Sequence, residues 1–170
     1  MPPLFYEAFE QLFEAEYKRL FRYLDRLSGE PDLAADLAQE AFVRLHQRGS
    51  MPDHPPLWLV TVALNLFRNA RSTRARRGRL LTLARAEAAL ADPPPAPDET
   101  GESSTAGARV RAALGTLPPR DRELLLLRGE GYSYRDIASA LKLNEPSIGT
   151  LLARAKRAFR EAYEDALDAP

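Results

Sequence analysis

Arginines interleaved with asparagines in the middle of the chain form a set of side chains that could bind a charged ligand. Residues 54–86 carry seven arginines and no acidic residue. Guanidinium groups bind phosphates or stack on unpaired bases, and asparagine amides hydrogen-bond base edges. In a helix Asn65, Arg68 and Asn69 share one side, and Arg71 lies near its edge. The block predicts a phosphate- or base-binding face, although a solvated face in an arginine-rich chain is an equal alternative.

A second candidate binding segment lies near the end of the chain. The sequence predicts a helix over Tyr134–Leu141, a turn over Lys142–Asn144 and a longer helix over Glu145–Arg160. Its inner face would carry Ile148, Leu152, Ala155 and Phe159, and its outer face Thr150, Arg154 and Arg157. This arrangement is typical of a helix-turn-helix that places its second helix in the major groove of DNA. A plain packing module is the alternative.

Composition excludes several other classes of protein. The formal net charge is zero, but the arginine block is followed by residues 87–108, which hold five acids and no base, so the local fields remain strong. There is no cysteine and there are two histidines, so we expect no disulfide, metal site or cofactor. Since no glycine-rich phosphate loop or nucleophile–base pair is present, we expect no enzyme. No apolar run reaches about 18 residues, so no membrane span is expected.

The elements that must position these side chains are all helices. The fold predicted is all-α, with two helical domains over residues 1–88 and 109–170 and a flexible, acidic, proline-rich linker over residues 89–108. Asp32 is the expected N-cap of the second helix, and Ser133 with Asp136 forms a predicted capping box. The expected helices are Phe5–Leu27, Asp32–His46, Leu57 towards Glu87, Val110–Leu117, Asp121–Glu130 and the two of the helix-turn-helix.

Two side chains near the arginine block have competing interpretations. Trp58 could stack on a base, but its register with Leu57 and Thr61 favours packing in the core. Asn65 could contact a base or satisfy a polar group inside the protein.

The two halves together resemble a known family, the extracytoplasmic-function (ECF, group 4) sigma factors of the sigma-70 family. DLAADLAQEAFVRL, residues 32–45, is similar to the family's polymerase-binding helix, and LWLVTVALNLFRNARSTRARR, residues 57–77, to its segment that binds the promoter −10 region. LPPRDRELLLLRGEGYSYRDIASALKL, residues 117–143, resembles the −35-binding domain. The order of the segments and the linker between them match as well.

The resemblance implies a role for each segment. Core polymerase contacts would come from Asp36, Gln39, Glu40 and Arg44. Contacts to −10 DNA would come from Asn65, Arg68, Asn69, Arg71, Arg74, Arg76 and Arg77, with an extruded base held partly by the loop over residues 48–56. Contacts to −35 DNA would come from Arg135, Ser147, Thr150, Arg154 and Arg157.

The implied function is promoter-specific initiation of transcription, with −10 and −35 recognition and −10 melting, and without catalysis. Implied partners are core RNA polymerase (the clamp helices of the largest subunit and the flap of the second largest), promoter DNA and an anti-sigma factor, in the bacterial cytoplasm. A stand-alone helix-turn-helix regulator is the alternative; such proteins usually form dimers on DNA half-sites.

The recognition helix departs from the family pattern. Gly149, Thr150 and Leu151 stand where the family has two basic residues around a serine. Two accounts remain open: either Gly149 allows a close approach to DNA, with Thr150 and Leu151 contacting bases, or the −35 contact is weak and the basic residues hold phosphates only. Arg135, where the family often has an acid, could offset part of the lost positive charge.

Overall fold

The protein is an all-α molecule, as the sequence predicts. The computed structural model describes residues 3–87 and 105–168, and no strand occurs among them. Most of the predicted acidic linker lies outside the described residues. The helices are α1 (Pro3–Ser28), α2 (Pro31–Arg48), α3 (Pro55–Glu87), α4 (Thr105–Thr116), α5 (Pro119–Gly129), α6 (Tyr134–Leu141) and α7 (Glu145–Asp168).

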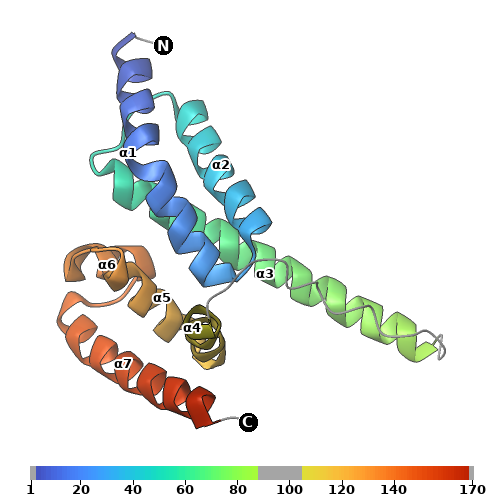
Figure 1. Cartoon of the computed structure of the whole chain (residues 1–170). Coiled ribbons are helices and arrows are strands. Elements are labelled where there is room, and N and C mark those ends of the chain that lie inside the picture. Colours follow the sequence, from blue (N-terminus) through green and yellow to red (C-terminus); the bar gives the residue numbers. More distant parts are fainter. Residues whose placement is uncertain (1–2, 88–104, 169–170) are drawn as a thin grey trace.

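The first half of the molecule is built from α1, α2 and the beginning of α3. Apolar residues at helical spacing give each helix one buried face, and the three faces meet in a common core. The buried side chains include Leu20, Leu24, Leu27, Leu37, Phe42, Leu45, Leu59, Val60, Leu64 and Phe67. Beyond Arg68 the apolar stripe ends, and α3 projects away from the body with residues 71–80 exposed (Figure 1). The sequence therefore changes from core to surface within one helix.

The start of α2 differs from the sequence expectation. Its N-cap is Glu30 and not Asp32, because Pro31 occupies the first helical turn. Proline lacks a backbone N–H and has its φ preset near the helical value, so it suits the first turn of a helix. The helix ends at Gly49, whose φ of 72° is left-handed and lets its N–H reach the carbonyls of Leu45 and His46.

The second half contains the predicted helix-turn-helix. Helix α7 packs against α4, α5 and α6, and α6 occupies the predicted residues. The Ser133 hydroxyl accepts a 3.1 Å hydrogen bond from the backbone N–H of Asp136, so this N-cap prediction is confirmed. Lys142 adopts a left-handed φ of 55° in the turn, and the N–H of Leu143 closes it on Ala138 O at 2.9 Å. Helix α4 begins at Thr105, earlier than expected, and α7 continues past Arg160.

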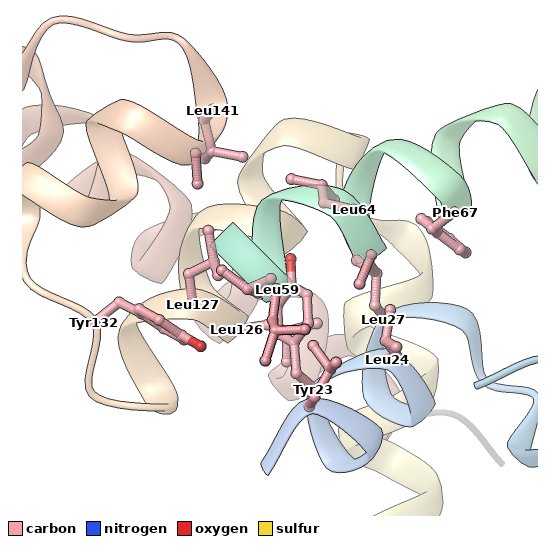
Figure 2. Close-up of a cluster of buried hydrophobic side chains, with 14 of the residues drawn as sticks. Tyr23, Leu24, Leu27, Leu59, Leu64, Phe67, Leu126, Leu127, Tyr132 and Leu141 are labelled. Atoms are coloured by element: carbon pink, nitrogen blue, oxygen red, sulfur yellow. The ribbon is translucent and has the colours of Figure 1, made fainter. Parts of the chain in front are cut away.

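The two halves pack directly on each other. Helix α5 contacts α1, and α6 contacts the beginning of α3 (Figure 1). Figure 2 shows side chains of both halves in one apolar cluster: Tyr23, Leu27, Leu59 and Leu64 from the first half, and Leu126, Leu127, Tyr132 and Leu141 from the second. The hydrophobic core is therefore continuous across residues that the sequence assigns to separate domains.

Candidate nucleic-acid and polymerase interfaces

The exposed arginines of α3 form one candidate nucleic-acid surface. Arg71, Arg76 and Arg77 are exposed on the part of α3 that leaves the body, and Asn65 and Asn69 are exposed on the turns just before it. Since Asn65 is exposed, it does not satisfy a polar group in the core. This stretch of helix presents amides and guanidinium groups in the combination that binds phosphates and base edges.

Two arginines of the same predicted set are already paired within the protein. Arg74 holds the carboxylate of Glu30 at 2.7 Å on an exposed part of the surface. Arg68 binds Glu123 of α5 through two hydrogen bonds, Nε to Oε1 at 3.1 Å and Nη2 to Oε2 at 2.7 Å. The Glu123 side chain is 5% exposed and that of Arg68 is 40% exposed. The hydrogen bonds with Glu123 raise the pKa of the Arg68 guanidinium, which therefore keeps its charge.

An open groove runs between α3 and the beginning of α5. Arg68, Arg71, Ser72, Arg76 and Arg79 line its α3 side, and Arg120 and Glu123 line its α5 side. The groove is rich in positive charge, a property that suits an anionic ligand.

Arg122 lies near this groove but has a structural role. Its guanidinium donates to the carbonyls of Leu114 and Gly115 at 2.8 and 3.0 Å, which belong to the last turn of α4. Burial, with the nearby charge of Arg71, lowers the pKa of Arg122. The bonds satisfy carbonyls that have no partner inside the helix, so we assign Arg122 to the junction of α4 and α5.

The loop before α3, predicted to help hold an extruded base, faces the second half of the molecule. Asp53, His54 and Pro55 line a pocket together with Tyr132 and Asp136. Trp58 is partly buried and packs against the core, and the Arg48 guanidinium lies 5.9 Å from the centre of its ring. The packing interpretation of Trp58 therefore describes this structure better than a free stacking platform.

The predicted polymerase-binding side chains share the outer side of α2. Asp36, Gln39, Glu40 and Arg44 are all exposed, and Glu40 pairs with Arg44 at 3.0 Å. Val43 lies among them with 46% of its surface exposed. Single exposed apolar side chains are common on protein surfaces, so the candidate interface rests on the polar and charged residues of this face.

The outer face of the helix-turn-helix is open. Arg135, Ser147, Thr150, Arg154 and Arg157 are all exposed. Arg154 is close to Asp121 of α5, at 3.8 Å, while its own side chain stays 67% exposed. A β-carbon added to Gly149 would lie 3.6 Å from the Tyr134 ring, so this glycine faces α6.

Sequence reasoning missed Glu123 and Glu130. Glu123 is three and four positions before Leu126 and Leu127, so it lies on the apolar face of α5. A carboxylate on an apolar helix face signals a buried partner, because an unpaired buried charge is costly. The sequence could have given this signal for Glu123, although it could not name Arg68 as the partner.

Other kinds of site are not found in the part of the chain that the structure describes. Its histidines, aspartates and glutamates form no group of three that could hold a metal ion. None of its helices is long and apolar enough to cross a membrane.

Comparison with known families matches both halves of the chain. The model for Sigma-70 region 2 matches residues 12–77, and the model for Sigma-70 region 4 matches residues 107–159. The fold resembles that of the sigma factor RpoE of Bartonella quintana, solved in complex with the anti-sigma factor NepR. The TM-score is 0.68 at 23% identity, over 93% of this chain and 98% of the other.

Curated proteins of similar sequence support the same family. The ECF RNA polymerase sigma factor SigE of Mycolicibacterium smegmatis is 30% identical over 161 residues, which are 91% of this chain; the chain spans 61% of the length of SigE. The ECF RNA polymerase sigma factor SigM of Mycobacterium tuberculosis is 31% identical over 153 residues, covering 88% of this chain and 74% of SigM. With regions 2 and 4 in this order on one helical scaffold, the chain belongs to the family of ECF RNA polymerase sigma factors.

Proposed function

We propose that the protein binds core RNA polymerase and directs it to promoters through contacts with −10 and −35 DNA. The observation that supports this most strongly is the presence of both sigma-70 regions in one chain. Region 2 carries the exposed arginines and asparagines of α3, and region 4 carries the exposed outer face of α7. Two DNA-binding surfaces on one non-catalytic protein suit a promoter-specificity subunit.

Each surface has its own part in this proposal. Asp36, Gln39, Glu40 and Arg44 of α2 bind the clamp helices of the largest polymerase subunit, and region 4 binds the flap of the second largest. The −10 element is bound and melted by the predicted set on α3, namely Asn65, Arg68, Asn69, Arg71, Arg74, Arg76 and Arg77. The −35 element is bound by Arg135, Ser147, Thr150, Arg154 and Arg157. For domain boundaries we propose residues 1–88, 89–108 and 109–170.

An anti-sigma factor is a further proposed partner, since the related RpoE fold was solved bound to one. The proposal places the protein in the bacterial cytoplasm with RNA polymerase. A stand-alone helix-turn-helix regulator is disfavoured, because it would leave the match to region 2 without a role.

Transcription in vitro with purified core polymerase tests the proposal. Promoters selected from a random library should yield defined start sites when the protein is added, and none with core polymerase alone. Arg71→Ala should reduce formation of open complexes, detected by permanganate reactivity of unpaired thymines. Arg154→Ala should weaken −35 binding by about 1–3 kcal/mol if it reads a base, and by less if it touches only phosphate. Failure to bind core polymerase or to select any promoter would refute the function.

A further inference from the structure

A cavity lies where the end of α1, the beginning of α2 and the middle of α3 meet (Figure 1). We call it the junction pocket. Its volume is about 410 Å³, within the range of about 300–1,000 Å³ of pockets that hold small organic ligands. Arg122 of α5 is part of its lining, whereas Asn65 and Asn69 are not. The junction pocket is therefore distinct from most of the surface proposed to bind −10 DNA.

The floor of the junction pocket is apolar. Leu27 and Phe67 line it and are 2% and 3% exposed, and Leu33 and Ala70 are partly buried beside them. Figure 2 shows Leu27 at the end of α1 and Phe67 on α3. An apolar floor with a few polar groups at the rim is the usual composition of a pocket for an organic molecule. A bare inorganic anion would leave this floor without a contact.

Positive charge is in excess at the rim of the pocket. Arg71, Arg74 and Arg122 bring three guanidinium groups, and Glu30 brings the one carboxylate of the described lining. Arg74 donates to both oxygens of Glu30 through Nη1, at 2.9 and 2.7 Å, so the charges of this pair offset each other. The other two arginines form no ion pair with the described residues. Two guanidinium charges therefore lack a counterion in this part of the chain.

These two guanidinium groups act on each other. Burial, with the nearby charge of Arg71, lowers the pKa of Arg122. Arg122 is held in place by its hydrogen bonds to the carbonyls of Leu114 and Gly115. The Arg71 guanidinium lies 5.7 Å from the centre of the Phe67 ring, above the floor of the pocket. An anion that contacts both arginines would replace their repulsion by charge-assisted hydrogen bonds.

Glu30 adds a hydrogen-bond acceptor to the same rim. The Ser28 hydroxyl fixes its backbone, because Oγ accepts from the Glu30 N–H at 3.1 Å and donates to the Glu30 carbonyl at 3.2 Å. The carboxylate oxygens share one nitrogen of Arg74 and keep lone pairs for other donors. The planar guanidinium of Arg71 can stack on a flat ring. A ligand that fits the whole pocket thus carries negative charge, a flat ring and N–H donors.

We infer that the junction pocket binds a free nucleoside diphosphate. The phosphates contact Arg71 and Arg122, the base lies on the apolar floor, and the N–H groups of the base face Glu30. Guanine has two adjacent N–H donors on one edge, so GDP is the probe that matches a carboxylate best. This site goes beyond the proposed function, since its occupation requires neither polymerase nor a promoter. A bound nucleotide competes with DNA for Arg71.

Isothermal titration calorimetry of the full chain with GDP tests the site. At physiological ionic strength GDP should bind with a stoichiometry of one. Guanosine and pyrophosphate should each bind at least about tenfold more weakly, because each lacks one half of the contacts. Absence of GDP binding would overturn the inference. Equal binding of pyrophosphate and GDP would also overturn it, since the arginines would then attract any anion.

Variants on α3 locate the binding site. Arg71→Ala removes a phosphate contact from an exposed position and should weaken GDP binding about tenfold or more. Ala70→Trp fills the pocket with a large side chain and should abolish GDP binding. Arg77→Ala is the matched control, because Arg77 is an exposed arginine of the same helix outside the pocket lining. Equal losses in Arg71→Ala and Arg77→Ala would overturn the inference, since GDP would then respond only to the charge of the helix.

A DNA strand offers the same chemistry through one of its nucleotides, so the two ligands are tested separately. Fluorescence anisotropy with a single-stranded oligodeoxynucleotide of randomised sequence reports DNA binding. Ala70→Trp should leave the affinity for this oligonucleotide unchanged while it removes GDP binding. Loss of oligonucleotide binding in Ala70→Trp, without GDP binding by the unmodified protein, would assign the pocket to DNA and overturn the inference. Promoter selection does not depend on GDP, so failure of this inference and failure of the proposed function are distinguishable.

Discussion

Arg68 and Glu123 form a bidentate ion pair although they are 55 residues apart in the chain and belong to different sigma regions. The carboxylate is almost fully buried while the arginine is partly exposed. The pair lies between a surface proposed to bind DNA and the helix that precedes the helix-turn-helix. The interaction free energy of this ion pair therefore affects both the stability of the protein and the availability of Arg68 for DNA.

The coupling between these two residues should be measurable in a double-mutant cycle. We expect Arg68→Ala and Glu123→Ala to destabilise the protein, and their coupling free energy to be about 1–2 kcal/mol, between the values for exposed and for buried pairs. Urea unfolding followed by circular dichroism gives the four free energies. The Arg77→Ala variant, which removes an exposed arginine of the same helix, is the control and should change the midpoint little. A coupling near zero would show that the pair does not join the regions in solution.

Stability at high pH should depend on Tyr132. Burial raises the pKa of Tyr132 to about 12, above its ordinary value of 10.0. The folded protein therefore keeps the phenolic proton at a pH where the unfolded chain has lost it. This contribution is fully present below about pH 10 and is lost as the pH rises towards 12, by on the order of 2 kcal/mol.

Comparison with Tyr132→Phe isolates this effect. The unmodified protein should lose stability relative to the variant between about pH 10 and 12, as measured by urea midpoints. Absorbance at 295 nm should show one tyrosine fewer titrating late in the variant. Parallel stability curves over this range would mean that Tyr132 is solvated, and hence that region 2 does not cover it as described.

Removal of the Tyr23 hydroxyl should leave stability unchanged or increase it. This side chain is buried and its hydroxyl has no hydrogen-bond partner among the described residues. Burial raises the pKa of Tyr23 well above its ordinary value, so the group stays neutral. Since an unsatisfied buried hydroxyl carries a desolvation penalty of about 1–3 kcal/mol, we expect Tyr23→Phe to stabilise by up to about 1 kcal/mol. A loss of more than about 1 kcal/mol would reveal a hydrogen bond that forms in solution.

Gly149→Ala should stabilise α7 without affecting DNA binding. The position is inside a helix, where alanine is favoured over glycine by about 1 kcal/mol. The new methyl group would meet the Tyr134 ring at an ordinary contact distance of 3.6 Å. Because this direction points to α6, we expect an unchanged affinity for −35 DNA in a gel-shift assay. A clear loss of affinity would support the other account, in which the glycine lets DNA come close.

Local sequence rules account for most of the helices. Apolar spacing places α1, α2 and the first half of α3, and the Ser133 cap and the turn after Leu141 delimit α6. Each of these features depends on a few neighbouring residues, so it can be predicted without knowing how the rest of the chain folds. The prediction of Asp32 as the N-cap of α2 was wrong. The helix begins one residue earlier, because Pro31 suits the first helical turn, and Glu30 becomes the N-cap. Helix α7 continues to Asp168, past the predicted end at Arg160, because no residue in between breaks the helix.

The residues of the candidate surfaces could be predicted from the sequence. Which of them are paired or covered by other parts of the protein could not. The sequence by itself determined the two regions, their order and the charge of each surface, because composition and helical periodicity are properties of short segments. Only the tertiary structure decided that Glu123 holds Arg68, that Glu130 meets three arginines of α1, and that Tyr132 closes the pocket beside the loop before α3. Such pairings join residues far apart in the chain, and they depend on how two apolar surfaces fit together, which no local pattern records.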